Sequence, residues 1–117
     1  MAMNLAQTPG AGGFDPEKPM FPISVVADIL KVHQRTLRIY DDETILVPNR
    51  SPKNRRLYSF NDIERGKFIQ FMTRELGINL AGIKIIIRLL KQQKVSPSQY
   101  LEHINQASQE LNIARQD

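Results

Sequence analysis

Residues 21–58 constrain the fold of this chain more than any other stretch of its sequence. Apolar side chains recur there at helical spacing in two short runs, which a two-residue turn separates, and a basic loop follows them. The spacing predicts a helix over residues 24–30, with Ser24 as its N-cap, and a second helix over residues 33–42. Two short helices joined by so tight a turn form a helix-turn-helix.

The second helix of this pair has two chemically different sides. At about 100° per residue, Gln34, Arg35 and Arg38 share an arc of roughly 100° on the circumference. Leu37 and Tyr40 lie together elsewhere on it, so that side can pack while the other offers a glutamine and two arginines to solvent. Such a face suits a polyanion, although an ordinary solvated basic surface explains this helix at least as well when it is taken alone.

A basic loop after the second helix has the composition of a hairpin tip. Residues 45–47 are a short apolar strand candidate that ends at Pro48, and residues 57–58 supply the returning strand. The loop between them contains no acidic residue, and its Asn54 tolerates a positive φ in the turn. The basic residues are Arg50, Lys53, Arg55 and Arg56. A hairpin with a basic tip is a wing, and an ordinary basic surface loop is the alternative.

The second half of the chain predicts two helices that belong to the core. Asn61 is expected to cap a helix over residues 61–76, which Gly77 would end. Asn79 is expected to cap the next helix, over residues 80–92. Both carry broad apolar faces, which we interpret as core packing and not as a ligand pocket.

A last helix, over residues 96–115, begins where Pro97 stands near its first position. Its seam follows a 3-4-3 spacing over about two heptads. The seam residues are Leu101, Ile104, Ser108 and Leu111. We expect this helix to form a homodimer through the seam, and a short amphipathic helix that folds back on its own domain is the alternative.

Composition narrows the possible functions. Residues 31–94 hold 14 basic and 6 acidic side chains between mildly acidic ends, which is typical of a surface that meets phosphate groups. The chain has no cysteine and only two histidines, which lie far apart, so neither a thiolate site nor a zinc site is expected. No motif pairs a nucleophile with a base. We therefore expect no enzymatic activity and no cofactor.

Length and hydropathy predict one domain with appended segments. Residues 1–20, rich in proline and glycine without periodicity, are expected to be a flexible tail. Residues 21–92 would form the winged helix-turn-helix domain, and residues 96–115 the dimerisation helix. Because the chain has no apolar run of about 18 residues and no signal peptide at its start, we expect a cytoplasmic protein.

The order of a helix-turn-helix, a basic wing, two further helices and a terminal helix resembles the MerR family of transcription regulators. The residues that carry the resemblance are Val32, Arg35-Thr36-Leu37-Arg38, Tyr40-Asp41, Leu46, Pro48, Arg50 and Arg56-Leu57-Tyr58. Within the family the chain is most similar to the heat-shock repressor branch, HspR, through Arg56-Leu57-Tyr58-Ser59, Asp62-Ile63-Glu64-Arg65 and the run from Thr73 to Ile83. Two departures from the family are Thr44, where many members have glycine, and Ile39-Tyr40, where many have Tyr-Tyr.

This resemblance implies a mainly α-helical, winged helix-turn-helix DNA-binding domain followed by a coiled-coil dimerisation helix. It also implies a homodimeric repressor of heat-shock chaperone genes that binds an inverted-repeat operator in double-stranded DNA. The chaperone DnaK is an expected partner on the same ground. An activator or a regulator of other genes is one alternative, and a basic module that binds an acidic protein is another.

The candidate DNA-binding residues fall into two groups. The second helix would read bases through Gln34, Arg35 and Arg38, since arginine pairs with guanine and glutamine with adenine. The wing would hold the DNA backbone, and we expect at least one acidic residue of 41–43 to pair with a wing arginine. Tyrosine hydroxyls would reach phosphate, with packing as an equal alternative. The full set is Gln34, Arg35, Thr36, Arg38, Tyr40, Arg50, Lys53, Arg55, Arg56 and Tyr58.

Overall fold

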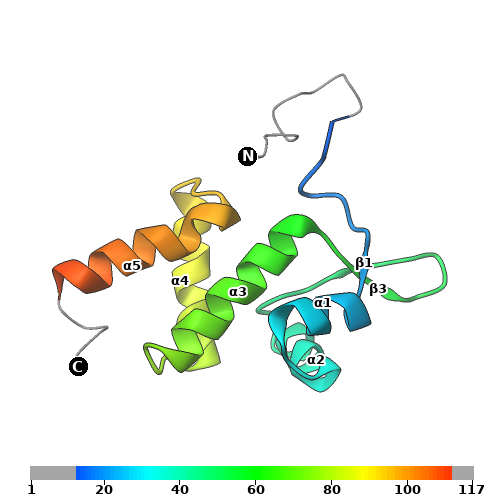
Figure 1. Ribbon diagram of the computed structural model, residues 1–117, viewed down its shortest axis with the longest axis horizontal. Helices are drawn as coiled ribbons and strands as arrows, with labels where there is room; N and C mark the ends of the chain where they lie inside the picture. Colours follow the sequence, from blue (N-terminus) through cyan, green and yellow to red (C-terminus); the bar gives the residue numbers. More distant parts are fainter. Residues whose placement is uncertain (1–12, 112–117) are drawn as a thin grey trace.

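Five α-helices and a small three-stranded sheet make up residues 13–111, the part of the chain that the computed structural model describes (Figure 1). The elements are β1 (Phe21–Pro22), α1 (Ile23–Leu30), α2 (Gln34–Asp42), β2 (Asn49–Arg50), β3 (Arg56–Tyr58), α3 (Phe60–Arg74), α4 (Leu80–Gln92) and α5 (Tyr100–Glu110), which a 3-10 turn over Pro97–Gln99 precedes. The mainly helical class expected from the sequence is confirmed. None of the helices in this part is long and apolar enough to cross a membrane.

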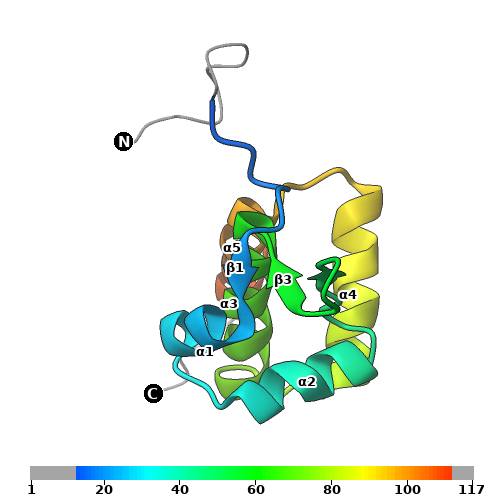
Figure 2. The same ribbon diagram turned by 90° about the vertical axis from the view of Figure 1, so that its right-hand side faces the viewer.

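The helix-turn-helix forms at the predicted place. Lys31 ends α1 with a left-handed φ of 58°, and the amide of Val32 donates to the carbonyl of Ala27 at 3.0 Å. This reversal sets α2 across α1 at one end of the molecule (Figure 2). The prediction that Ser24 caps α1 is wrong: the N-cap is Pro22, which makes no side-chain bond. Because Pro22 is held extended by strand pairing, the helix begins immediately after it.

The sheet differs from the predicted hairpin. Its order is β1-β3-β2, so β3 pairs with Phe21–Pro22 on one edge and with Asn49–Arg50 on the other. Residues 45–47 do not form a strand, because the amides of Ile45 and Leu46 both donate to the carbonyl of Tyr40 at the end of α2. Thr44, with a φ of 55°, turns the chain there in a left-handed conformation that glycine adopts most easily.

Helix α3 begins at Phe60, and its N-cap lies two residues before the predicted cap. Ser59 is the N-cap: its hydroxyl accepts from the Asp62 amide at 3.0 Å, and the Asp62 carboxylate accepts from the Ser59 amide at 2.9 Å. The prediction of Asn61 is therefore wrong. The helix ends at Arg74, and Gly77 follows with a φ of 63°.

The predicted cap of α4 is confirmed, because Asn79 Oδ1 accepts from the Gly82 amide at 2.8 Å.

Helix α3 runs through the centre of the molecule and carries much of the core (Figure 1). Phe68 and Ile69 on α3 are fully buried, as are Tyr58 and Tyr100. The rings of Phe68 and Tyr100 meet edge to face at 5.3 Å, which joins the start of α5 to α3. The core therefore depends on the C-terminal helix as well as on the helix-turn-helix.

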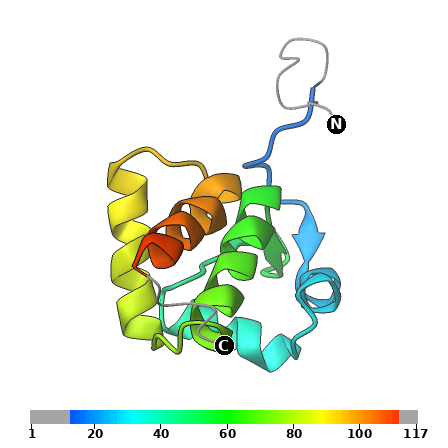
Figure 3. The ribbon, with the colours of Figure 1, turned by 60° about the vertical axis from the view of Figure 1, so that its left-hand side comes forward.

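Helix α5 folds back against α3 of its own chain (Figure 3). Leu101 and Ile104 pack against the core, and Ser108 is buried, whereas Leu111 is 68% exposed. Three of the four predicted seam residues are thus wholly or partly buried within one chain, as expected for a helix that folds back on its own domain. Residues 112–115 of the predicted helix lie outside the described residues, and dimerisation stays a prediction.

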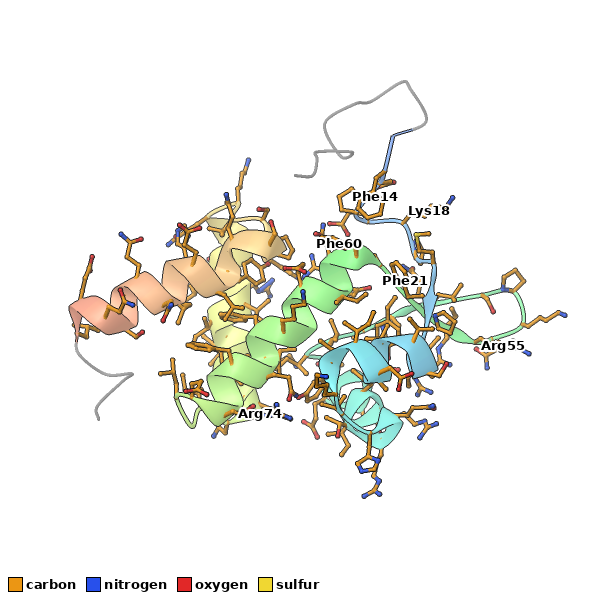
Figure 4. All side chains as sticks on the ribbon, in the orientation of Figure 1. Phe14, Lys18, Phe21, Arg55, Phe60 and Arg74 are labelled. Carbon is orange, nitrogen blue, oxygen red and sulfur yellow. The ribbon has the colours of Figure 1, made fainter. Side chains whose placement is uncertain are left out.

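The segment just before β1 contacts the domain, although it was expected to belong to the tail. The rings of Phe14 and Phe60 meet edge to face at 5.4 Å (Figure 4). The Asn61 amide group donates to the Glu17 carboxylate at 2.7 Å, and the Met20 amide donates to the Tyr58 carbonyl at 3.0 Å. The tail expected over residues 1–20 therefore reaches residue 13 at most, and residues 1–12 lie outside the described part.

Candidate nucleic-acid interface

The outer side of α2 is the first element of the candidate interface. Arg35 and Arg38 are exposed, and the guanidinium of Arg38 donates to Gln34 Oε1 at 3.3 Å. Leu37 and Tyr40, on the other side, are 0% and 4% exposed and fix the helix to the core. The predicted division of this helix into a packing side and a polar side is confirmed. Thr36 is half-buried at the flank.

The wing is the second element, and its turn is closed by hydrogen bonds within the loop. The Ser51 amide donates to the Arg55 carbonyl at 2.8 Å, and the Arg55 amide donates to Ser51 Oγ at 3.1 Å. Asn54 takes a φ of 64°, as its side-chain chemistry predicts, and its carbonyl accepts from Arg50 at 3.2 Å. The ordered turn presents Lys53 and Arg55 to solvent, with Arg55 near the wing tip (Figure 4).

Asp41 joins the two elements. Its Oδ2 accepts from Nε of Arg56 at 2.9 Å and lies 3.6 Å from Nη2 of Arg50. Asp41 is the residue of α2 next to the buried Tyr40, and its side chain is only 15% exposed. The expectation that an acidic residue of 41–43 pairs with a wing arginine is confirmed. The carboxylate holds the wing at a defined position relative to α2.

The two predicted tyrosine contacts are core residues. Tyr58 is fully buried, its hydroxyl has no hydrogen-bond partner among residues 13–111, and burial raises its pKa to about 12. The Tyr40 hydroxyl accepts from the Gln70 side-chain amide. Burial raises the pKa of Tyr40, and the bond from Gln70 and the charge of Arg74 oppose that rise. We therefore leave both hydroxyls out of the interface, because neither is placed to reach phosphate.

Two basic residues outside the predicted set lie beside α2. Arg74, at the end of α3, is exposed and close enough for its charge to lower the pKa of Tyr40 (Figure 4). Lys84 on α4 donates to the Glu43 carbonyl at 3.2 Å and to Thr44 Oγ1, so it stabilises the C-terminal end of α2. Sequence spacing gives no signal for either, because both are brought to α2 by tertiary packing.

Comparison with known proteins agrees with this geometry. Residues 21–90 match the family described as MerR HTH family regulatory protein, which takes in the helix-turn-helix, the wing, α3 and most of α4. The chain belongs to the MerR family. This family is one of regulatory proteins, so the expectation that the chain is not an enzyme is confirmed at the level of the family.

Individual curated proteins also match part of the chain. The chain is 36% identical to the transcriptional regulator GlnR of Bacillus anthracis over 75 residues, which are 64% of this chain and 57% of GlnR. It is 42% identical over 76 residues to a protein of Streptomyces coelicolor named heat shock protein HspR, covering 65% of this chain and 50% of that protein. The chain thus spans about half the length of the curated relatives that it matches.

A solved structure has a similar fold. The N-terminal part of MtaN, the multidrug transporter activator of Bacillus subtilis, matches with a TM-score of 0.54 and 30% identity over 78% of this chain and 90% of that one. This similarity in fold supports the assignment of α1, α2 and the wing between β2 and β3 as a winged helix-turn-helix.

Proposed function

We propose that this protein is a homodimeric, sequence-specific DNA-binding repressor of heat-shock chaperone genes. The observation that carries the proposal is the pair of exposed cationic elements, the α2 face and the wing, which Asp41 joins through Arg50 and Arg56. A rigid link between two such elements suits the alternation of major groove and backbone along a DNA duplex. The protein would act in the cytoplasm, where it meets the genes it controls.

Helix α2 would enter the major groove with Arg35 and Arg38 leading. Either arginine can pair bidentately with guanine, and Gln34 can pair with adenine. The Arg38–Gln34 hydrogen bond, at 3.3 Å, is long and exposed, so DNA can replace it at little cost. One of the two arginines is expected to hold phosphate, with Thr36 at the flank of the same helix.

The wing would hold the backbone or the adjacent minor groove. Lys53 and Arg55 are exposed at its turn, while Arg50 and Arg56 have part of their charge engaged by Asp41. If each protomer neutralises about 3–4 phosphates, the affinity of a dimer should fall steeply as salt rises. A nearly flat dependence on salt would count against DNA binding through these residues.

A homodimer would read an inverted repeat, because two-fold symmetry in the protein requires it in the operator. The proposed interface lies in the helix after Ser96. Since Leu101, Ile104 and Ser108 are covered within the chain, the interface would use the exposed end at Leu111 or an exchange of α5 between protomers. Sedimentation at several protein concentrations would distinguish a dimer from a monomer.

Control of chaperone genes is proposed from the 42% identity with the protein named HspR. The resemblance to that branch also suggests DnaK as a partner, with the helix after Ser96 and residues 112–117 as candidate contact regions. The 36% identity with GlnR favours a second candidate function, a regulator of other genes. Genomic fragments selected by the purified protein would separate the two: chaperone promoters support the first, and their absence from the bound set rejects it.

Substitution tests the site independently of the target genes. Changing Arg38 and Arg56 together to alanine should abolish binding to the selected fragments. Arg88→Ala removes an exposed cation from α4 that belongs to neither element, and should leave binding unchanged. If the double variant binds like the wild type, the proposed site is wrong, and binding of the basic face to an acidic protein becomes the better explanation.

A further inference from the structure

Helix α2 carries one large apolar side chain that does not serve the core. Ile39 is 43% exposed and is not among the side chains that pack against the core of the described residues. The other apolar side chains of α2, Leu37 and Tyr40, are 0% and 4% exposed. An exposed isoleucine in so polar a helix contributes little to folding, since its β-branched side chain also favours helices less than alanine does.

The position of Ile39 places it beside the residues proposed to read bases. At about 100° per residue, Ile39 lies some 40° around the helix from Arg35 and one turn further along it. Arg38 is its neighbour in the sequence and is also exposed. When α2 enters the major groove, Ile39 therefore enters with these two arginines. Asp42, the remaining exposed residue on this side, lies a turn beyond Arg38.

We propose that Ile39 is a specificity-determining residue that packs against the 5-methyl group of a thymine. The inference rests on the proposed function, because it assumes that α2 reads the major groove. Thymine is the base that presents a methyl group on that edge, whereas adenine and guanine present polar acceptors there. Isoleucine against those acceptors would remove water from them without offering a donor. Ile39 thus selects for thymine and against purines at one position of each half-site.

The geometry of the helix limits where that thymine lies. Ile39 lies four positions beyond Arg35 in the α-helix, a rise of about 6 Å. Successive bases on a DNA strand are about 3.4 Å apart. The thymine read by Ile39 should lie within about two base pairs of the base that Arg35 contacts. An operator with no thymine in that part of its half-site would overturn the inference.

Replacement of single thymines by deoxyuridine tests the contact, because uracil lacks the methyl group and keeps the hydrogen-bonding edge. The probe is an operator duplex recovered by genomic selection, with each thymine replaced in turn and affinity measured by fluorescence anisotropy. Burial of one methyl group is expected to change affinity about fourfold per half-site, and about 15-fold when both half-sites are changed. For Ile39→Ala, the same replacement should have no effect, and the variant should bind the unmodified operator more weakly.

A matched control separates this contact from a general loss of apolar surface. Ile85→Ala removes an isoleucine that is 62% exposed on α4, and this variant should keep the full response to deoxyuridine. If the wild type selects no DNA sequence, the proposed function itself fails. If the wild type binds its operator but uracil changes nothing, or changes binding equally in the wild type and Ile39→Ala, only the assignment of Ile39 is wrong.

Discussion

Replacement of Asp41 by alanine should loosen the wing and weaken the domain. The variant loses a hydrogen bond of 2.9 Å to the Arg56 guanidinium, in a pair whose side chains are 15% and 21% exposed. A hydrogen bond to a charged group contributes about 1.5–3 kcal/mol. Two smaller effects oppose this loss. The substitution removes a carboxylate that is unfavourable near the C-terminal end of α2, and alanine is the better helix former. Together these effects stabilise the variant by about 0.5–1 kcal/mol.

The net destabilisation expected for Asp41→Ala is therefore about 1–2 kcal/mol, or a melting temperature about 5–10 °C lower. Asp42→Ala is the matched control. Asp42→Ala also removes a carboxylate near the C-terminal end of α2 and also introduces alanine, the better helix former. Asp42 makes no ion pair among residues 13–111, so this variant should be as stable as the wild type or slightly more stable. The difference between the two variants gives the contribution of the contacts of Asp41 with Arg56 and Arg50.

DNA binding gives a second measurement on the same variants. Asp41→Ala adds one net positive charge, which by itself would strengthen non-specific binding. If Asp41 positions the wing, affinity for the operator should nevertheless fall while affinity for random DNA stays the same or rises. Equal thermal unfolding and equal operator affinity for Asp41→Ala and Asp42→Ala would refute the argument that this carboxylate links α2 to the wing.

Three further predictions concern single positions. Ser59→Ala should destabilise the protein by about 1 kcal/mol in urea unfolding, because it removes half of the capping box with Asp62, and an unchanged midpoint would contradict that role. Asn54→Ala should cost about 1 kcal/mol, since its φ of 64° is strained for alanine, whereas Asn54→Gly should be nearly neutral; equal effects of the two would reject the argument. The pKa of Tyr58 is about 12 when folded and about 10 when unfolded, so the neutral phenol favours the folded state, and stability should fall as pH rises from about 10 to 12. Tyr58→Phe should show less of this fall in thermal unfolding scans, and an identical pH profile would contradict the assignment.

Much of the candidate interface could be predicted from local sequence. The 3.6-residue period separated Arg35 and Arg38 from Leu37, because a helix places these residues on different sides whatever surrounds it. The side-chain chemistry of Asn54 allowed its positive φ, and Asn79 could cap α4 without help from distant residues. These predictions held because each depends on a few neighbouring residues.

The predictions of strand and cap positions were wrong where the local sequence allows two conformations or two capping residues. Residues 45–47 have the composition of a strand, yet the amides of Ile45 and Leu46 donate to the carbonyl of Tyr40, and strand pairing begins only at Asn49. Ser59 and Asn61 can both cap a helix, and the carboxylate at Asp62 favoured Ser59 through a reciprocal bond. Asn61 instead bonds to Glu17, a contact between residues 44 positions apart that spacing could not predict.

The sequence by itself determined which segments are helical and which residues α2 offers to a ligand, because periodicity and turn chemistry are local properties. Tertiary structure decided the rest. It buried Tyr40 and Tyr58, set Asp41 against Arg56, brought Lys84 to the end of α2 and packed Leu101, Ile104 and Ser108 of the α5 seam against its own chain. Each of these outcomes depends on which residues, far apart in the sequence, pack together and exclude water. A pattern along the chain does not contain that information.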